Sequence, residues 1–373
     1  MKLIQGSEGL LARVFLALVL IIGCLLQPET ARAASEPYLT APAAILMEAS
    51  TGQVLYERGA RKERPPASTT KIMTAILALE LARPDVVVKV SEHAAATPGA
   101  SIYLKAGETL TMGDLVKGAL LNSGNDAAVA IAEGIAGTEK GFAWLMNRKA
   151  KQIGAYHTHF INPHGLTEPE HYTTAYDLAL MARYALGNPE FRRLVATRED
   201  QIPAPDGVRY LYNTNRLLES YPGADGVKTG TTDAAGQCLV ASASREGRRL
   251  IAVVLGSEDR YADAQALLDY GFNAFYSEAA AVGEPVGRVS VKNGEFQSVT
   301  VAPVTTIGFT VPVEEAPFLE KRVILPAAVK APVRKGQTLG RMLILYKGRE
   351  VANTSLVSTQ DVAALSWWAQ FKQ

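Results

Sequence analysis

The apolar and polar positions of residues 1–33 follow a pattern that is typical of an export signal. A short polar, basic start is followed by an apolar run from Val14 to Leu26 and by the small-residue site Ala31-Arg32-Ala33. The run is shorter than the roughly 20 residues that a membrane span needs, so we predict cleavage after Ala33 rather than a retained span or a buried helix. Lipoprotein processing at Cys24 is an alternative, because Ile21-Ile22-Gly23-Cys24 loosely matches a lipidation site.

Residues 34–278 alternate between strand and helix periodicity. The stretch from Ala43 to Tyr56 is interrupted by Ser50-Thr51-Gly52 and predicts a hairpin. Ser68 to Leu81 is apolar almost all round, which predicts a central, buried helix. We expect further helices at Leu115–Leu121, Asp126–Ile135, Gly141–Ile153, Thr173–Leu186 and Ala262–Phe275, and strands at Gln237–Ser244 and Arg249–Gly256. Strands at both ends with helices between them predict an α+β domain with an antiparallel sheet around a helical middle.

Residues 279–360 have a different texture. Val289, Val291, Val299 and Val301 alternate with polar residues around Asn293-Gly294, which is a hairpin signal. Met342–Leu345 and Val351 flank Lys347-Gly348-Arg349 in the same way. Because no helical periodicity intervenes, these residues predict a small all-β domain.

Residues 361–373 form an aromatic tail. From Val362 to Phe371, helical spacing places Ala364, Leu365, Trp367, Trp368 and Phe371 on one face. Tryptophan favours the membrane–water interface, so we expect an amphipathic helix that lies in a membrane surface. The competing interpretation is that these aromatic side chains pack back onto the β domain.

Composition narrows the class of protein. The chain has 373 residues with 38 basic and 37 acidic side chains, and loss of residues 1–33 would leave 35 of each. This balance, together with the lack of a Lys/Arg block, argues against a nucleic-acid partner. Cys238 would then be the only cysteine, so no internal disulfide is possible, and we interpret it as a small apolar side chain in a strand.

Three short segments carry candidate chemistry. Pro66-Ala67-Ser68-Thr69-Thr70-Lys71 puts Ser68 and Lys71 on one helical face, where a desolvated lysine can accept the proton of a nucleophilic serine. Alone, this spacing is weak evidence, since a serine at a helix start commonly caps it.

The other two segments are equally ambiguous when taken singly. Ser123-Gly124-Asn125 offers a hydroxyl and an amide, but such residues also punctuate helices. Lys228-Thr229-Gly230 offers a cation, a hydroxyl and a glycine that lets a substrate approach a strand edge, but it also suits a surface turn. It is not the end of a phosphate-binding loop, because Val227 stands where that motif needs glycine.

Together and in this order, the three segments resemble those of the low-molecular-mass penicillin-binding proteins, the serine D-alanyl-D-alanine carboxypeptidases of bacterial cell walls. Gly124 departs from the S-D-N form of the middle motif, and Ser-Gly-Asn is typical of the carboxypeptidase branch. The resemblance extends to Asn162–Leu166, Tyr172–Asp177 and Gly223–Val227 and covers essentially the whole chain after residue 33. It implies a β-lactamase/transpeptidase-like catalytic domain, with an antiparallel sheet and a helical cluster, before the all-β domain.

The resemblance also implies roles for the matched residues. Ser68 would attack the carbonyl between the two terminal D-alanines of a peptidoglycan stem peptide, and Lys71 would take its proton. Ser123 would relay that proton to the leaving amine, while Asn125 holds Lys71 and the peptide backbone. Penicillins and other β-lactams would acylate the same serine, and no cofactor is implied.

The third segment supplies substrate-binding residues in this resemblance. Lys228 and Thr229 would hold the terminal carboxylate, with help from Arg260, and Gly230 would give the peptide access to the strand. The backbone amides of Ser68 and Thr231 would form the oxyanion hole. Such an enzyme would work at the outer face of the cytoplasmic membrane or in the cell wall.

Three alternatives are weighed against this interpretation. His157, His159, His164 and His171 lie within fifteen residues, but no H-E-x-x-H motif or carboxylate at ligand spacing accompanies them, so we expect no metal site. A β-lactamase would need a deacylating carboxylate, and no Glu-x-x-x-Asn loop is found. A catalytically silent wall-binding protein is disfavoured because every expected catalytic position is filled.

Overall fold

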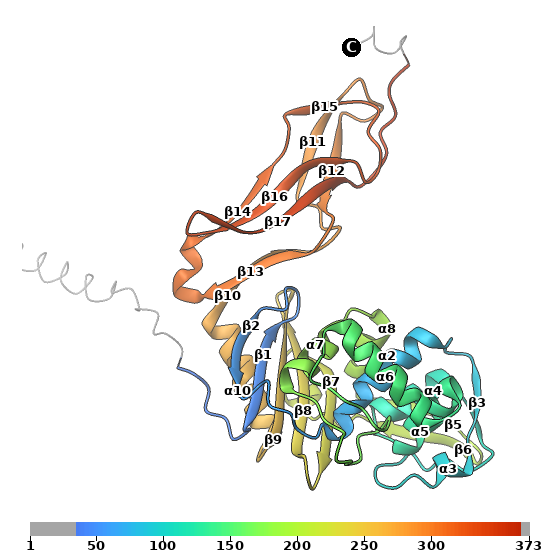
Figure 1. Ribbon diagram of the computed structural model, residues 1–373. Helices are drawn as coiled ribbons and strands as arrows, with labels where there is room; N and C mark the ends of the chain where they lie inside the picture. Colours follow the sequence, from blue (N-terminus) through green and yellow to red (C-terminus); the bar gives the residue numbers. More distant parts are fainter. Residues whose placement is uncertain (1–34, 367–373) are drawn as a thin grey trace, which may run out of the picture. The chain divides into compact units, whose positions relative to one another are not determined.

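The first part of the molecule is built on a five-stranded antiparallel sheet in the order β2-β1-β9-β8-β7. The structure is a computed structural model that describes residues 35–366 (Figure 1). The strands of this sheet are β1 (Ala43–Glu48), β2 (Val54–Arg58), β7 (Ala224–Thr232), β8 (Gly236–Arg245) and β9 (Arg248–Ser257). Pairing of β1 with β9 joins the first hairpin to the last, which confirms the predicted assembly of the sheet.

Both faces of this sheet are buried, because successive side chains of a strand point to opposite sides. On β1, Ile45 and Met47 pack into the core on one face, whereas Ala44 and Leu46 pack into the core on the other. The helix α10 (Arg260–Ala274) covers the second face, and the helical middle of the chain lies against the first (Figure 1).

The helix α2 (Lys71–Leu81) is the centre of the helical middle. Every residue from Lys71 to Ala78 is buried, as expected for a helix that is apolar all round. The first turn of the predicted helix is a separate 3-10 turn, η1 (Ala67–Thr70). The other helices of this region are α3 (Glu92–Ala95), α4 (Met112–Leu120), α5 (Asn125–Ala136), α6 (Glu139–Ile153), α7 (Ala175–Ala185), α8 (Pro189–Ala196) and α9 (Leu217–Ser220).

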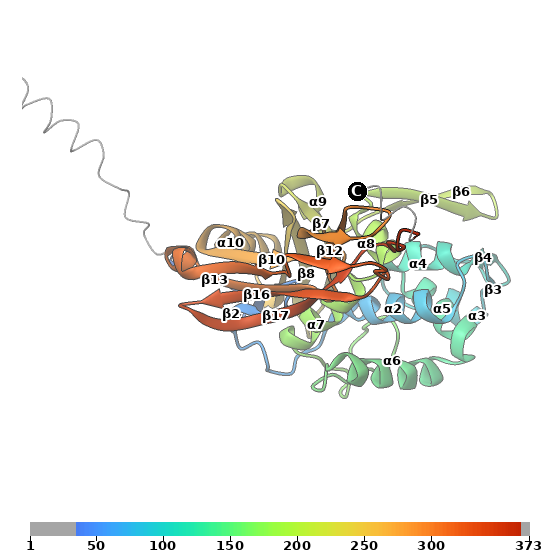
Figure 2. The same ribbon diagram turned by 90° about the horizontal axis from the view of Figure 1, so that it is seen from above.

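Two hairpins that the hydrophobic pattern does not predict complete this part. They are β3 (Val87–Lys89) with β4 (Thr109–Thr111), and β5 (Glu199–Ala204) with β6 (Gly207–Tyr212). The strands β3 and β4 have only three residues each and β5 is largely polar, so little periodicity marks these three strands. In both views they lie at the end of the helical middle away from β1 and β2 (Figure 2).

The region after Ala274 contains no α-helix as far as Ser366, which agrees with the predicted all-β texture. Here β10 (Phe275–Ala280) pairs with β13 (Ile307–Pro312), and a six-stranded sheet has the order β14-β16-β17-β12-β11-β15. Its strands are β11 (Gly287–Lys292), β12 (Ser298–Pro303), β14 (Leu319–Ile324), β15 (Ala328–Lys330), β16 (Thr338–Tyr346) and β17 (Arg349–Ser358), with a 3-10 turn η2 (Val313–Phe318) between β13 and β14. The predicted alternation holds, since Val289 and Val301 point into its core.

The predicted amphipathic helix from Val362 is wrong for the part of the tail that the structure describes. Val362 pairs with Val333, and Ala364 pairs with Gly294, so this segment is extended and follows the β region. Val362 is buried in the β core, and this packing outweighs the helical spacing on which the prediction rested. Residues 367–373 and the predicted export signal lie outside the described residues. Among residues 35–366, no helix is long and apolar enough to cross a membrane.

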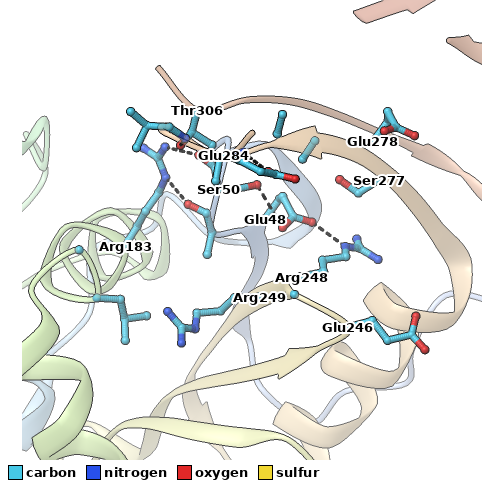
Figure 3. A pocket seen from close by; sticks show the side chains of 18 of the residues that line it. Glu48, Ser50, Arg183, Glu246, Arg248, Arg249, Ser277, Glu278, Glu284 and Thr306 are labelled. Carbon is cyan, nitrogen blue, oxygen red and sulfur yellow. Dashed lines mark hydrogen bonds and ion pairs between the residues drawn. The ribbon is translucent and has the colours of Figure 1, made fainter. Parts of the chain in front are cut away.

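A cavity of about 820 Å³ contains none of the three motifs (Figure 3). It is lined by the β1–β2 turn, α7, the β8–β9 turn and β10. Apart from the exposed Glu246, its charged groups have partners in the protein. Arg248 donates to the buried Glu48 at 2.7 Å and to the carbonyls of Gly271 and Phe275. We therefore attribute a structural role to these groups, which clamp the end of α10 against β1.

Candidate active site

Ser68 lies in the 3-10 turn η1 and is half-buried at the wall of a cleft of about 660 Å³. Ala67, immediately before it, has a φ of 49°, which is a strained conformation for a residue with a side chain. Ser68 does not act as a helix cap, because α2 has Thr70 at its N-cap position and no side-chain cap bond. The bland interpretation of the Ser68 segment, a capping serine, is therefore wrong.

Lys71 is fully buried, and its amine is held by three oxygen atoms. Its Nζ lies 3.1 Å from Ser68 Oγ, 2.7 Å from Asn125 Oδ1 and 2.9 Å from the carbonyl oxygen of His164. Burial, reinforced by the positive charge of Lys228, holds the pKa of Lys71 well below its usual value. A neutral amine at this distance can accept the proton of the Ser68 hydroxyl.

Asn125 is the first residue of α5, and both the oxygen and the nitrogen of its side-chain amide are hydrogen-bonded. Its Nδ2 donates to the carbonyl of Pro98 at 2.7 Å, so its oxygen is oriented toward Lys71. Ser123, two residues earlier, has a φ of 63° and lines the same cleft as Ser68. The predicted break between two helices is thus present, and it positions a hydroxyl and an amide rather than only ending α4.

Lys228 is also fully buried, on the strand β7 that forms an edge of the five-stranded sheet. Its Nζ donates to the carbonyl of Thr229 at 3.1 Å. Burial, with a further contribution from Arg260, lowers its pKa to about 7. Two buried lysines next to one serine are an arrangement that tunes protonation near neutral pH.

Gly230 lines the cleft and also has a packing role. A Cβ at this position would lie 2.9 Å from the backbone nitrogen of Ser68 and 3.0 Å from Ala67 Cβ. The glycine therefore allows η1 to pack against β7, which brings the first and third motifs together. Access of the substrate to the strand, the role expected from the sequence, remains a prediction beside this packing role.

Arg260, at the start of α10, reaches across to the third motif. Its guanidinium donates to the carbonyls of Gly230 and Cys238, to Gln237 Oε1 and to Thr231 Oγ1. Thr229, Gly230, Thr231 and Arg260 all line the cleft that contains Ser68 and Ser123. All of the predicted site residues are thus gathered in one place, with Lys71, Asn125 and Lys228 behind the cleft surface.

Sequence reasoning missed several residues that shape this site. Asn213, Thr214 and Arg216 line the cleft, and Thr214 Oγ1 lies 2.6 Å from Thr229 Oγ1. The run Asn213-Thr214-Asn215-Arg216 is a cluster of polar residues shortly before the third motif. This cluster is the sequence feature that indicates a further cleft-lining segment.

The loop around His164 and Gly165 supports Lys71 and was noted only as part of the resemblance. His164 is buried, and its Nε2 lies 3.4 Å from Glu139, which also contacts His93 at 2.7 Å. Burial lowers the pKa of His164, and its Nδ1 accepts a bond from the backbone of Leu166, so the neutral ring holds the loop in place. The loop carbonyl is thereby aimed at Lys71.

Three of the four histidines considered as metal ligands have side-chain partners among the residues that the structure describes, whereas His157 is bonded only through its backbone nitrogen. His171 is buried with its pKa lowered to about 3 by burial, and it bonds Thr70 Oγ1 and the backbone nitrogen of Ile161. His159 bonds the carbonyl of Glu170. Within residues 35–366, no group of three metal-ligating side chains is arranged to hold an ion. Cys238 is fully buried in β8, which confirms its interpretation as a small apolar side chain.

Comparisons with known proteins agree with this geometry. Residues 30–259 match the D-alanyl-D-alanine carboxypeptidase family model, and residues 277–364 match the C-terminal domain of penicillin-binding protein 5. The chain is 38% identical to the D-alanyl-D-alanine carboxypeptidase DacF of Bacillus subtilis over 335 residues, or 86% of each chain.

Solved structures give the same picture. The fold is similar to that of penicillin-binding protein 5 from Haemophilus influenzae, with a TM-score of 0.68 and 28% identity over 88% of this chain and 99% of the other. A mutant of the Streptomyces K15 DD-transpeptidase matches with a TM-score of 0.61 and 34% identity, over 64% of this chain and 99% of that one. That smaller protein therefore corresponds to about two thirds of this chain.

Gly165 allows a test of whether the loop around His164 must lie close to η1 in order to hold Lys71. A Cβ at this position would lie 1.8 Å from the carbonyl oxygen of Ala67, so Gly165→Ala must push the His164 carbonyl away from Lys71. We expect the rate of covalent labelling by a fluorescent penicillin, measured per folded molecule, to fall about 100-fold. Gly137→Ala is the control, because Gly137 has a similar φ of 74° and nothing within 4 Å. Equal labelling rates in the two variants would contradict this account.

Proposed function

The chain belongs to the D-alanyl-D-alanine carboxypeptidase family of serine peptidases, and on this premise we propose which of its residues carry the reaction. The enzyme removes the terminal D-alanine from peptidoglycan peptides through an acyl-enzyme, and it binds β-lactams. The observation that carries our proposal is the contact between Ser68 and the buried amine of Lys71. A serine beside a desolvated, neutral amine is an activated nucleophile.

Acylation begins when Ser68 Oγ attacks the carbonyl between the two terminal D-alanines. Lys71, in its neutral form, takes the hydroxyl proton over the 3.1 Å between the two atoms. The developing oxyanion is stabilised by the backbone amides of Ser68 and Thr231. Removal of one such donor typically raises the barrier by about 3 kcal/mol.

The leaving group needs a proton and a binding site for its carboxylate. Ser123 relays the proton from Lys71 to the amine nitrogen as the C–N bond breaks, so free D-alanine leaves. Lys228, Thr229 and Arg260 hold the terminal carboxylate through charge and hydrogen bonds. Asn125 keeps Lys71 oriented through its 2.7 Å bond. Water then hydrolyses the ester on Ser68 and restores the hydroxyl.

Replacement of the nucleophile tests the first assignment. Ser68→Ala should lower D-alanine release from a soluble pentapeptide about 10⁶-fold, the scale seen when a serine peptidase loses its nucleophile. Intact mass after incubation with penicillin should show no adduct. Thermal unfolding should change little, because Lys71 keeps two of its three acceptors. Ser220→Ala, a change at an exposed serine that bonds only its own helix, is the control and should label normally. A folded Ser68→Ala protein that still gains the adduct would remove Ser68 from its role.

The pH dependence of acylation tests Lys71 and Lys228. Because burial lowers the pKa of Lys71, its neutral, active form should appear well below pH 10.5, and kcat/KM should rise with pH over that range. Above about pH 7, kcat/KM should fall as Lys228 loses the charge that holds the substrate carboxylate. Lys71→Arg should lower the acylation rate by about 10³-fold, because arginine stays protonated. The exposed Lys151→Arg serves as the control, and normal acylation by Lys71→Arg at neutral pH would exclude Lys71 as the base.

We further propose that the enzyme acts outside the cytoplasmic membrane and is attached to its surface by residues 367–373. Two considerations support this: residues 1–33 have the order of an export signal, and Trp367, Trp368 and Phe371 suit the membrane–water interface. A segment of this length can lie in the interface, but it is too short to span a bilayer.

Truncation tests the attachment. Removal of Trp367–Gln373 leaves Val362 and its β-core contacts in place, so the thermal stability should not change. The truncated protein should move from the membrane pellet to the supernatant, with unchanged activity on a soluble pentapeptide. A truncated protein that still sediments with membranes, or that melts at a lower temperature, would show that the aromatic tail has another role.

A further inference from the structure

One face of the β5–β6 hairpin presents apolar side chains to solvent. Val208, Tyr210 and Tyr212 alternate along β6 and therefore share a face, with 52%, 61% and 59% of their surfaces exposed. The opposite face is anchored, because Leu211 and Ile202 of the same hairpin are buried. The buried side chains of one face thus anchor the hairpin to the domain, while the rings of Tyr210 and Tyr212 on the other face are exposed to solvent.

Tyr103 adds a third exposed ring on the neighbouring loop. It is 82% exposed although its φ is 60°, a sparsely populated conformation for a tyrosine. The fully buried carboxylate of Asp126 maintains this conformation, since it accepts bonds from Ser101 Oγ and from the backbone nitrogens of Ile102 and Leu104. A strained backbone that is held from inside in order to expose a ring points to a use for that ring.

The loop and the hairpin are fastened to each other. Arg209 donates to the carbonyl of Tyr103 at 3.2 Å and pairs with Glu108 at 3.0 Å, and both charged side chains are largely buried. Lys105 pairs with Asp206 at 3.1 Å across the same junction. Tyr103, Tyr210 and Tyr212, which we call the tyrosine surface, therefore lie on a fixed support. The exposed Glu199 lies directly across from Tyr212 on the same face of the hairpin.

The tyrosine surface is continuous with the catalytic cleft at two points. Tyr212 donates its backbone N–H to Asn122 Oδ1 at 2.6 Å, and Asn122 and Asn213 line the cleft. Tyr103 follows three residues after Ala100, which also lines it. From Tyr212 to Val208 the strand extends about 13 Å, so Tyr210 and Tyr212 can lie along one extended ligand.

We propose that the tyrosine surface binds the amino-sugar strand to which the stem peptide is attached, so that the enzyme recognises polymeric wall as well as peptide. The flat, electron-rich faces of tyrosine rings suit the C–H faces of pyranose rings, and the phenol hydroxyls suit their hydroxyl and acetamido groups. The exposed carboxylate of Glu199 beside Tyr212 would repel an anionic lipid surface, so it suits an uncharged polymer better. This inference rests on the proposed function, in which the end of the stem peptide occupies the cleft.

Two substrates separate this inference from the catalytic assignment. Tyr210→Ala/Tyr212→Ala should leave kcat/KM for a soluble pentapeptide within about twofold, because neither ring belongs to the catalytic machinery. For D-alanine release from isolated pentapeptide-containing peptidoglycan, KM should rise about tenfold, the sum expected for two lost ring contacts.

Three controls make the result decisive. Tyr210→Phe/Tyr212→Phe should restore most of the affinity, because stacking needs the rings. Tyr156→Ala, at a 73% exposed tyrosine of the same domain, should have no effect. Binding to vesicles of anionic lipid should be the same in all variants. The proposal would be overturned if Tyr210→Ala/Tyr212→Ala impaired turnover of the soluble pentapeptide and of peptidoglycan equally, or did not raise KM for peptidoglycan. It would also be overturned if Tyr156→Ala had a similar effect, if the phenylalanine variant did not restore affinity, or if only binding to vesicles changed. If the wild-type enzyme did not release D-alanine from the soluble pentapeptide, the proposed function itself would be overturned instead.

Discussion

The active site depends on the exclusion of solvent from the amine of Lys71, which three oxygen atoms hold in place. No carboxylate neutralises it directly, since its three acceptors are a hydroxyl, an amide and a backbone carbonyl. An ammonium ion without a negatively charged partner is costly to bury, so burial favours the neutral form of the Lys71 amine. The apolar surroundings of α2 are thus a catalytic requirement as well as a packing solution. Lys228 adds a second positive charge nearby and makes protonation of Lys71 still less favourable.

Close approach of backbone segments is the second requirement. Gly230 lets η1 lie against β7, and Gly165 lets the His164 loop lie against Ala67, and in both places a Cβ would be closer than packing allows. Ser68 is therefore held between a strand, a helix and a loop that lie far apart in the sequence. Such a site has little freedom to drift, which matters because reaction rates are sensitive to displacements of about 1 Å.

Two consecutive residues of α5 connect the reaction centre with the surface outside it. Asn125 faces inward and holds Lys71, whereas Asp126 holds the loop that carries Tyr103. The first turn of one buried helix therefore fixes both the proton acceptor and part of the tyrosine surface. This arrangement explains how a small cleft can be kept in register with a surface that contacts a much longer substrate. The larger cavity near Glu48 has no such connection to the motifs.

The buried helix, four of the five strands of the main sheet, the all-β character after Ala274 and the candidate residues Ser68, Lys71, Asn125 and Lys228 followed from the sequence, whereas β7, which carries Lys228, did not. Periodicity and motif order are local properties, and both survive in the fold. Tertiary structure alone decided the rest. The β5–β6 hairpin has too few buried positions to mark it, Val362 follows the β core rather than a helical period, and Gly230 lies where η1 packs against β7. Each of these depends on what lies opposite a residue in space, and a linear pattern carries no record of that.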